Sequence, residues 1–149
     1  MAQLIITILA CVLSVLLALF FMYLSGLHRY WALGGTWLRN DVIPEVDGKP
    51  VFQMHPAPAM IAAIAFILAA FIVTGRVGFF GRLAPPAFFY WANWLLAIAF
   101  FARGIGDFRL FGLFKKVRDT RFARLDSKVF VPVAFVLGIG VALLGLYPR

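Results

Sequence analysis

Acidic residues, and charged residues of any kind, are scarce in this sequence. Only six of the 149 residues are Asp or Glu, and 13% are charged, against about 25% in an ordinary soluble domain. Hydrophobic residues make up 64% and the mean hydropathy is +0.96, whereas soluble domains are roughly 45–50% apolar. A water-soluble fold could not bury this much apolar surface. We therefore expect an all-α membrane protein that forms a single membrane domain over residues 1–149.

Cysteine is nearly absent as well, since Cys11 is the only one in the chain. This excludes an intrachain disulfide and a CxxC site. The sequence also contains no HExxH, GxSxG, P-loop or dinucleotide-binding fingerprint, and these are the short motifs that would indicate a metal site or a common catalytic mechanism. No metal site is predicted.

Four apolar segments have lengths close to the roughly 20 residues that a helix needs to cross a bilayer. The predicted helices cover about residues 4–26, 57–74, 86–102 and 129–147. Prolines stand at the start of the second and third segments, where the missing N–H matters least, and Ser127 is the predicted N-cap of the fourth. The sequence predicts a four-helix transmembrane bundle.

The basic residues are unevenly divided between the connections. The connections 28–55 and 103–128 hold eleven of the 14 Lys and Arg residues, together with all six acidic residues and both histidines. The positive-inside rule places these two connections in the cytoplasm and both termini outside. Because the basic residues flank apolar spans, anionic lipid headgroups rather than nucleic acid are the expected partner.

The first connection opens with aromatic residues that suit the membrane interface, namely Tyr30, Trp31 and Trp37. Further along, Asp47-Gly48 lies between two short β-prone runs, which predicts a small β-hairpin. We expect this connection to form an ordered cap over the bundle.

The second connection interleaves aromatic and basic residues between Gly104 and Lys116, a pattern typical of a segment in the headgroup layer. Arg103 and Asp107 stand four residues apart and would pair if the helix continued through the glycines. Asn93 lies in the middle of the third span, where it could bond to Ser14 or to a neighbouring backbone. Packing explains this asparagine more simply than function does.

The two histidines offer two kinds of chemistry. His28 beside Asp107 or Asp126 could act as a general acid or base. His28 and His55 flank the first two helices on the same side and could ligate a haem, but a haem in a helix bundle usually takes histidines from within the helices. No cofactor is predicted, and haem through this pair is a remote alternative.

Several motifs together resemble one family of small bacterial four-helix membrane proteins, classed as a domain of unknown function. They are the run 28–37 (HRYWALGGTW), the run 103–109 (RGIGDFR), Phe114-Lys115 and the run 120–126 (TRFARLD). The resemblance covers nearly the whole chain. It implies four helices, a bacterial source, no established activity, and one site formed jointly by the two connections. We therefore expect the protein in a bacterial inner membrane.

The leading hypothesis is a cytoplasmic-face site that binds an anionic lipid or an amphiphilic ligand with an acidic head. The candidate ligand-binding residues are Arg29, Tyr30, Trp31, Trp37, Arg103, Asp107, Arg109, Lys115, Arg121 and Arg124. One alternative is a small membrane enzyme acting on a lipid-dissolved substrate. Another is an accessory subunit of a larger membrane complex, and small residues on the fourth helix could also serve a homo-oligomer.

Overall fold

The computed structural model describes residues 1–38, 41–46, 49–51, 55–81 and 83–148. Its elements are α1 (Ala2–Ala32), β1 (Glu45–Val46), β2 (Lys49–Pro50), α2 (Pro56–Arg76), α3 (Pro86–Ile105), α4 (Arg121–Leu125), the π-helical turn η2 (Asp126–Phe130) and α5 (Val131–Gly145). The last three form one continuous helix, Arg121–Gly145. The described part of the chain thus has four helices long and apolar enough to cross a membrane.

Three helix ends differ from those predicted. The first helix continues through Gly26 to Ala32 and ends just before Gly34, which has φ +95°. The third continues past residue 102 and ends at Gly106, also with φ +95°. Glycine adopts this left-handed conformation without the steric cost that a side chain brings.

The fourth helix begins earlier than expected, and Ser127 is not its N-cap. The Thr120 hydroxyl oxygen accepts a hydrogen bond from the Ala123 N–H at 3.1 Å, and Ser127 lies within η2. Residues 28–32, 103–105 and 121–128, expected in connections, are therefore helical.

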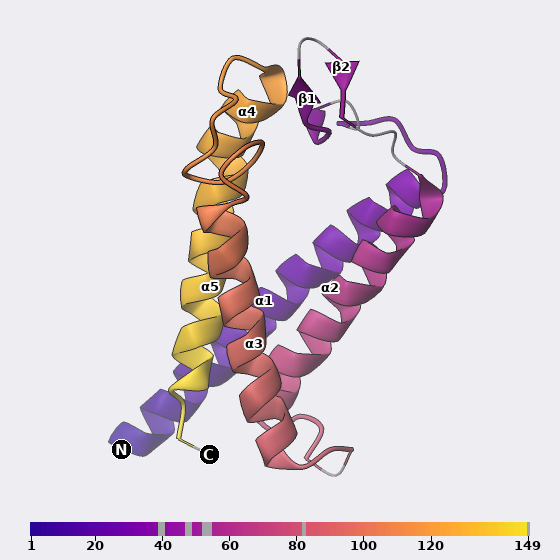
Figure 1. Cartoon of the computed structure of the whole chain (residues 1–149). Coiled ribbons are helices and arrows are strands. Elements are labelled where there is room, and N and C mark those ends of the chain that lie inside the picture. Colours follow the sequence, from indigo (N-terminus) through magenta and orange to yellow (C-terminus); the bar gives the residue numbers. More distant parts are fainter. Residues whose placement is uncertain (39–40, 47–48, 52–54, 82, 149) are drawn as a thin grey trace.

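The helices form two closely packed pairs, α1 with α2 and α3 with α5 (Figure 1). The pairs cross near the end that holds both termini and diverge toward the end that holds α4 and the hairpin (Figure 1). Small residues on α5 pack within the chain: Gly138 faces the Phe101 ring and Gly145 faces the Trp94 ring. Two of the small residues on the last helix, Gly138 and Gly145, therefore serve packing within the chain.

Polar side chains inside the bundle bond to backbone carbonyls of neighbouring helices. Ser14 Oγ donates to the Val73 carbonyl at 3.0 Å, and Asn93 Nδ2 donates to the Val141 carbonyl at 2.8 Å. Of the two partners predicted for Asn93, the structure therefore shows the backbone one.

The predicted hairpin is present. β1 and β2 pair antiparallel, with Glu45 opposite Pro50 and Val46 opposite Lys49. The turn predicted at Asp47-Gly48 lies outside the described residues. We call the end of the molecule that carries this hairpin, the connection 106–120 and α4 the basic end.

Candidate functional site

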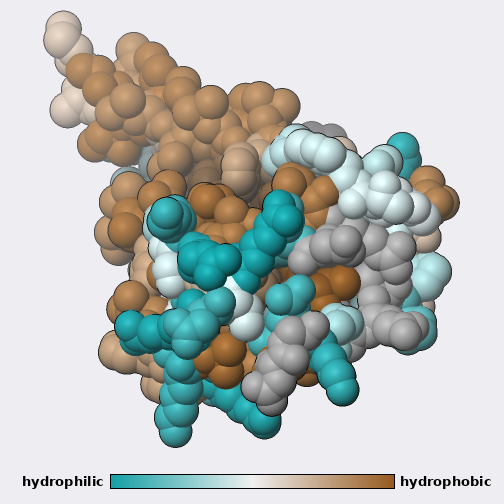
Figure 2. Space-filling model, turned by 90° about the horizontal axis from the view of Figure 1, so that it is seen from above, coloured by the Kyte–Doolittle hydropathy of each residue, from teal (hydrophilic) through white to brown (hydrophobic). Residues whose placement is uncertain are grey.

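The described basic residues gather at the basic end, except for Arg76 at the opposite end. Figure 2 looks down on the basic end and shows hydrophilic residues around and over patches of hydrophobic surface. The site is built beneath this surface, where the two helix pairs separate.

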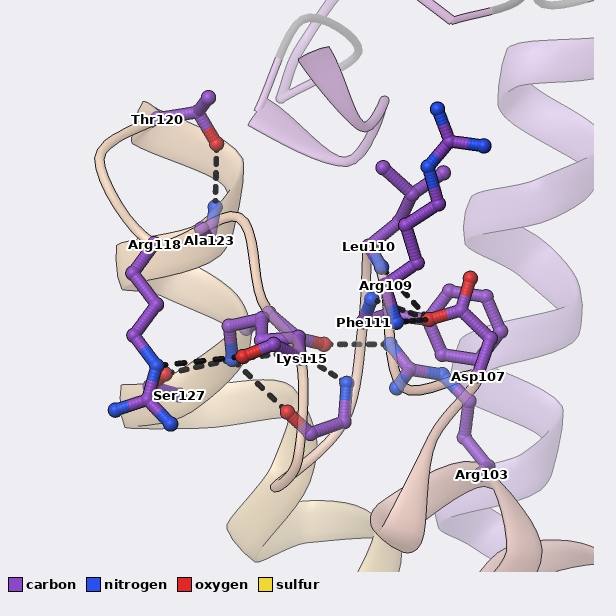
Figure 3. Close-up of polar contacts among 12 residues, drawn as sticks. Arg103, Asp107, Arg109, Leu110, Phe111, Lys115, Arg118, Thr120, Ala123 and Ser127 are labelled. Atoms are coloured by element: carbon purple, nitrogen blue, oxygen red, sulfur yellow. Dashed lines mark hydrogen bonds and ion pairs between the residues drawn. The ribbon is translucent and has the colours of Figure 1, made fainter. Parts of the chain in front are cut away.

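A buried carboxylate organises the basic end. Asp126, in η2, is completely buried and accepts hydrogen bonds from three donors, one on α3 and two on the connection. Arg103 Nη2 lies 2.7 Å from its Oδ1, while Lys115 Nζ at 3.0 Å and the Gly112 N–H at 2.8 Å bond its Oδ2. Figure 3 labels two of these groups, Arg103 at the end of α3 and Lys115 in the connection. An uncompensated charge at this depth would be costly, so the cluster fixes the connection to the last helix.

Lys115 is the buried cation of this cluster. Its side chain is 2% exposed, and its Nζ also donates to the Gly112 carbonyl at 3.1 Å and to Ser127 Oγ at 2.7 Å. An ammonium group has three donors, and all three have acceptors here. Lys115, predicted to meet a ligand, is thus occupied within the protein.

Two glycines let the connection fold tightly around the cluster. Gly106 has φ +95° and Gly112 has φ +90°, and their backbones touch. A Cβ on Gly106 would lie 2.0 Å from the Phe111 carbonyl oxygen. The Leu113 N–H then bonds the Gly104 carbonyl at 2.8 Å, which ties the connection to the end of α3.

Asp107 does not pair with Arg103. The predicted pair required the helix to continue through the glycines, and α3 ends before Asp107. Its Oδ1 instead accepts hydrogen bonds from the N–H groups of Arg109, Leu110 and Phe111 at 2.7–3.1 Å (Figure 3). Burial acts to raise the pKa of this carboxyl group, but the backbone donors outweigh it and hold the pKa below the ordinary 3.8. Asp107 stabilises the turn.

An apolar cleft of about 440 Å³ opens between the helix pairs, next to the cluster. This volume is within the range of small-molecule sites. Most of the lining is aliphatic or aromatic. The lining residues with polar atoms in their side chains are Tyr23, His28, Trp31 and Arg103. The full lining is Phe20, Tyr23, Leu24, Leu27, His28, Trp31, Leu38, Val42, Phe66, Phe100, Arg103, Leu125, Val129, Phe130, Val133, Ala134 and Leu137.

Arg103 connects the cleft to the buried cluster. Its side chain is 35% exposed, and its guanidinium carbon lies 4.8 Å from the centre of the Phe111 ring. Nη1 has no hydrogen-bond acceptor among the described residues. The Arg103 side chain therefore pairs with Asp126 through Nη2, while the N–H groups of Nη1, which is buried, donate to no described residue.

An ion pair links the two connections at the basic end. Arg121 Nε lies 2.7 Å from Asp41 Oδ1, and its Nη2 lies 3.2 Å from Asp41 Oδ2. The Arg121 side chain is 74% exposed, so this pair contributes little stability. It does join the first connection, which supplies Leu38 and Val42 to the cleft, to α4.

Five other predicted binding residues are not in the cleft lining, namely Arg29, Tyr30, Trp37, Arg109 and Arg124. The Tyr30 hydroxyl accepts hydrogen bonds from the Thr36 and Trp37 N–H groups, and the Trp37 carbonyl accepts one from Trp31 Nε1 at 2.8 Å. Of the arginines, Arg124 Nη1 donates to the Asp119 carbonyl. Arg29 and Arg109 are exposed. The structure thus brings Trp31, His28 and Arg103 together in one cleft.

His28 contacts neither of the acidic residues predicted beside it. Its Nδ1 lies 2.9 Å from the Leu24 carbonyl oxygen, and its ring packs on Trp31 and Phe66. His55 is exposed at the start of α2, and no contact joins the two histidines in the described part of the chain. Among the same residues, no group of three or more His, Cys, Asp or Glu could hold a metal ion.

Sequence reasoning missed most of the apolar lining. Phe20, Phe66, Phe100 and Leu137 lie within spans whose outward faces are equally apolar, so hydropathy could not separate them. Asp41 was also missed as the partner of Arg121. Its only sequence signal is that acidic residues are rare in this chain.

A family model described as "Protein of unknown function (DUF3995)" matches residues 21–141. No curated protein and no solved structure matches the chain. The matched segment includes the Asp126 cluster and the whole cleft lining except Phe20.

Proposed function

The chain belongs to the DUF3995 family of proteins of unknown function, and we propose that this multi-pass membrane protein binds an anionic lipid, or another amphiphile with an acidic head, in the cleft between its helix pairs. The observation that carries the proposal is the guanidinium of Arg103 in the wall of an otherwise largely apolar cleft. An amphiphile matches this arrangement, because its tail can replace lipid against the lining while its head meets the arginine.

Charge balance favours an anionic head. The cluster contains two cations, Arg103 and Lys115, and one carboxylate, Asp126. Lys115 is buried and fully bonded, so the excess positive charge is available at Arg103. A guanidinium binds phosphate or carboxylate groups through paired hydrogen bonds, and such bonds are stronger away from bulk water.

The surrounding surface supports the same class of ligand. Arg109, Lys116 and Arg124 are exposed at the basic end, and each basic residue near a membrane surface adds about 1 kcal/mol of attraction to anionic lipids. Trp31 lines the cleft and contributes an apolar surface for the first part of the tail. We assign the exposed basic residues to attraction of lipid and Arg103 to specific binding.

The proposed orientation follows from the same charges. Positive residues near spans are retained on the cytoplasmic side, so the connections 28–55 and 103–128 would face the cytoplasm of a bacterial inner membrane. The ligand would then come from the cytoplasmic leaflet, where anionic headgroups are abundant.

Native mass spectrometry of the protein purified in mild detergent from its own membrane tests this proposal. We expect a bound small molecule of discrete mass that Arg103→Gln removes. The matched control is Arg109→Gln, the same substitution at an exposed arginine outside the cleft. It removes one surface charge and weakens attraction, but the bound molecule should still be present. Arg103→Gln leaves Lys115 to balance Asp126, so the bundle should still fold. A bare wild-type chain, or a stoichiometric protein partner in place of a small molecule, would contradict the proposal and favour an accessory subunit.

A second candidate is an enzyme that acts on a lipid-dissolved substrate, and the position of His28 in the same cleft favours it. The Leu24 carbonyl, rather than an acidic residue, would orient the imidazole. Incubating phosphatidylglycerol with the protein in nanodiscs, followed by mass spectrometry of the extracted lipid, tests this candidate. A new lipid mass that disappears in His28→Phe would support catalysis, and unchanged lipid would argue against turnover of this substrate.

A further inference from the structure

His28 has one ring nitrogen bonded to the protein and one that is not. Nδ1 lies 2.9 Å from the Leu24 carbonyl oxygen. A carbonyl oxygen can only accept, so Nδ1 must carry the hydrogen of this bond. In the neutral ring Nε2 is then a hydrogen-bond acceptor.

The free nitrogen belongs to a ring held in place within the cleft. The imidazole packs edge-on against Trp31, with ring centres 5.0 Å apart, and against Phe66 at 5.1 Å. Nε2 has no hydrogen-bond partner among the described residues, and it is not among their buried unpaired atoms. An acceptor held in this way can be bonded by a group that enters the cleft.

The geometry points to a ligand whose head combines an anionic group with a hydroxyl. We propose, building on the amphiphile-binding function above, that Arg103 takes the phosphate and His28 Nε2 accepts a hydrogen bond from a headgroup hydroxyl. A phosphodiester lipid with a glycerol head, such as phosphatidylglycerol, has both groups within a few bonds of each other. Lipids whose head ends at the phosphate or in an alkyl group satisfy only Arg103.

Selectivity for lipids with a headgroup hydroxyl follows because His28 Nε2 would otherwise lack a hydrogen-bond partner. A site built to bond a hydroxyl disfavours the analogue that lacks it, because the protein acceptor loses its partner in a water-poor environment. One neutral hydrogen bond corresponds to about a three- to tenfold difference in affinity.

The test compares two matched lipids on the full-length protein. Phosphatidylglycerol and phosphatidylpropanol have the same phosphodiester, charge and three-carbon head, but phosphatidylpropanol lacks both hydroxyls. Titrations of each lipid into detergent-solubilised protein, read by native mass spectrometry, give two dissociation constants. Wild type should bind phosphatidylglycerol about three- to tenfold more tightly.

Variants assign the preference to one nitrogen. His28→Phe keeps an aromatic ring against Trp31 and Phe66 but removes the acceptor, so both lipids should bind with the weaker constant. His55→Phe, at the exposed histidine outside the cleft, should keep the preference. Equal binding of both lipids by wild type, or a preference that survives His28→Phe, overturns the assignment while the amphiphile-binding proposal stands. Failure of wild type to bind either lipid overturns both the His28 assignment and the amphiphile-binding proposal. The comparison of the two lipids on wild type does not depend on the folding of any variant.

Discussion

At the residue scale, the Asp126 cluster explains how a mostly apolar protein keeps charges at depth. Asp126→Asn removes the only carboxylate of the cluster and leaves Lys115 buried without a counter-charge. Breaking a buried pair in this way costs about 3–5 kcal/mol. We expect a clearly lower midpoint of thermal unfolding in mild detergent.

Two further variants test whether an unbalanced buried charge causes the loss of stability. Lys115→Met leaves Asp126 paired with Arg103 and should lose less stability than Asp126→Asn. The double variant Lys115→Met/Asp126→Asn should recover part of the loss, since no buried charge of this pair is then unbalanced. Equal stability of Asp126→Asn and wild type would show that the buried pair does not stabilise the fold.

Asp107 predicts a dependence of stability on pH. Its folded-state pKa lies below the 3.8 of the unfolded chain, so its stabilising contribution is present above pH 3.8 and is lost as pH falls through the lowered value. Asp107→Ala should therefore have a lower unfolding midpoint than wild type near neutral pH, and this difference should close below pH 3.8. Asp119→Ala removes an exposed carboxylate from the same connection and is the control. A difference between Asp107→Ala and wild type that stays constant at low pH would contradict this role.

The sequence indicated which residues would take part in polar contacts better than it indicated the partners of those residues. The sequence offered Asp107, four residues away, as the partner of Arg103 if the helix continued through the glycines, whereas the structure pairs Arg103 with Asp126, 23 residues away. The condition is not met, because the left-handed conformation of Gly106 ends α3. Local spacing cannot reveal a partner that tertiary packing supplies.

At the element scale, the connection 106–117 folds back closely on itself because Gly106 and Gly112 have no side chains at the point where the backbone segments meet. Gly106→Ala would place a Cβ against the Phe111 carbonyl oxygen, and a backbone atom cannot move aside as a side chain can. Gly34 has the same φ of +95°, but an added Cβ there meets nothing within 4 Å. Gly34→Ala should thus cost only the conformational strain, about 1–3 kcal/mol.

The two alanine variants separate strain from collision. Gly106→Ala should lower the thermal unfolding midpoint well beyond Gly34→Ala, and it should weaken binding of the anionic lipid because the turn fixes Arg103 and Lys115. Similar losses in the two variants would mean that the contact between Gly106 and Gly112 is unimportant for the fold.

The number and type of the elements were predictable, and their ends were less so. Four long apolar runs and the proline-marked starts predicted α2 and α3 closely. The end of α1 and the start of the last helix depended on polar or aromatic residues that hydropathy assigns to connections. Those residues form helix readily, and at the last helix Thr120 caps the N–H of Ala123. The hairpin was predicted from turn chemistry, and its strands are present.

At the scale of the whole molecule, the proposed orientation can be measured with single cysteines. On a Cys11→Ala background, Lys116→Cys marks the basic end and Pro148→Cys marks the opposite end, both at exposed positions. In intact bacterial spheroplasts, a membrane-impermeant maleimide should label Pro148→Cys at once and Lys116→Cys only after the membrane is permeabilised. The reverse pattern would place the basic end outside and contradict the positive-inside assignment.

The cleft is a property of the whole molecule that the sequence did not indicate. It exists because α1 and α2 diverge from α3 and α5 toward the basic end (Figure 1). Every span is apolar on all sides, so no periodicity distinguishes lipid-facing residues from cleft-lining residues. Sequence reasoning placed the basic and aromatic residues at the correct end, while packing decided that Arg103 and Trp31 line the cleft and that Lys115 is buried.

The most direct test of the central claim is to locate a bound anionic lipid by photo-cross-linking. A phosphatidylglycerol analogue with a diazirine near the head end of its acyl chain should label cleft residues of α1 and α5, such as Leu24 and Val133. Arg103→Gln should remove this label and Arg109→Gln should keep it. Label that is confined to outward-facing residues such as Leu95 and Ile98, or that is unchanged in Arg103→Gln, would contradict the cleft as the binding site.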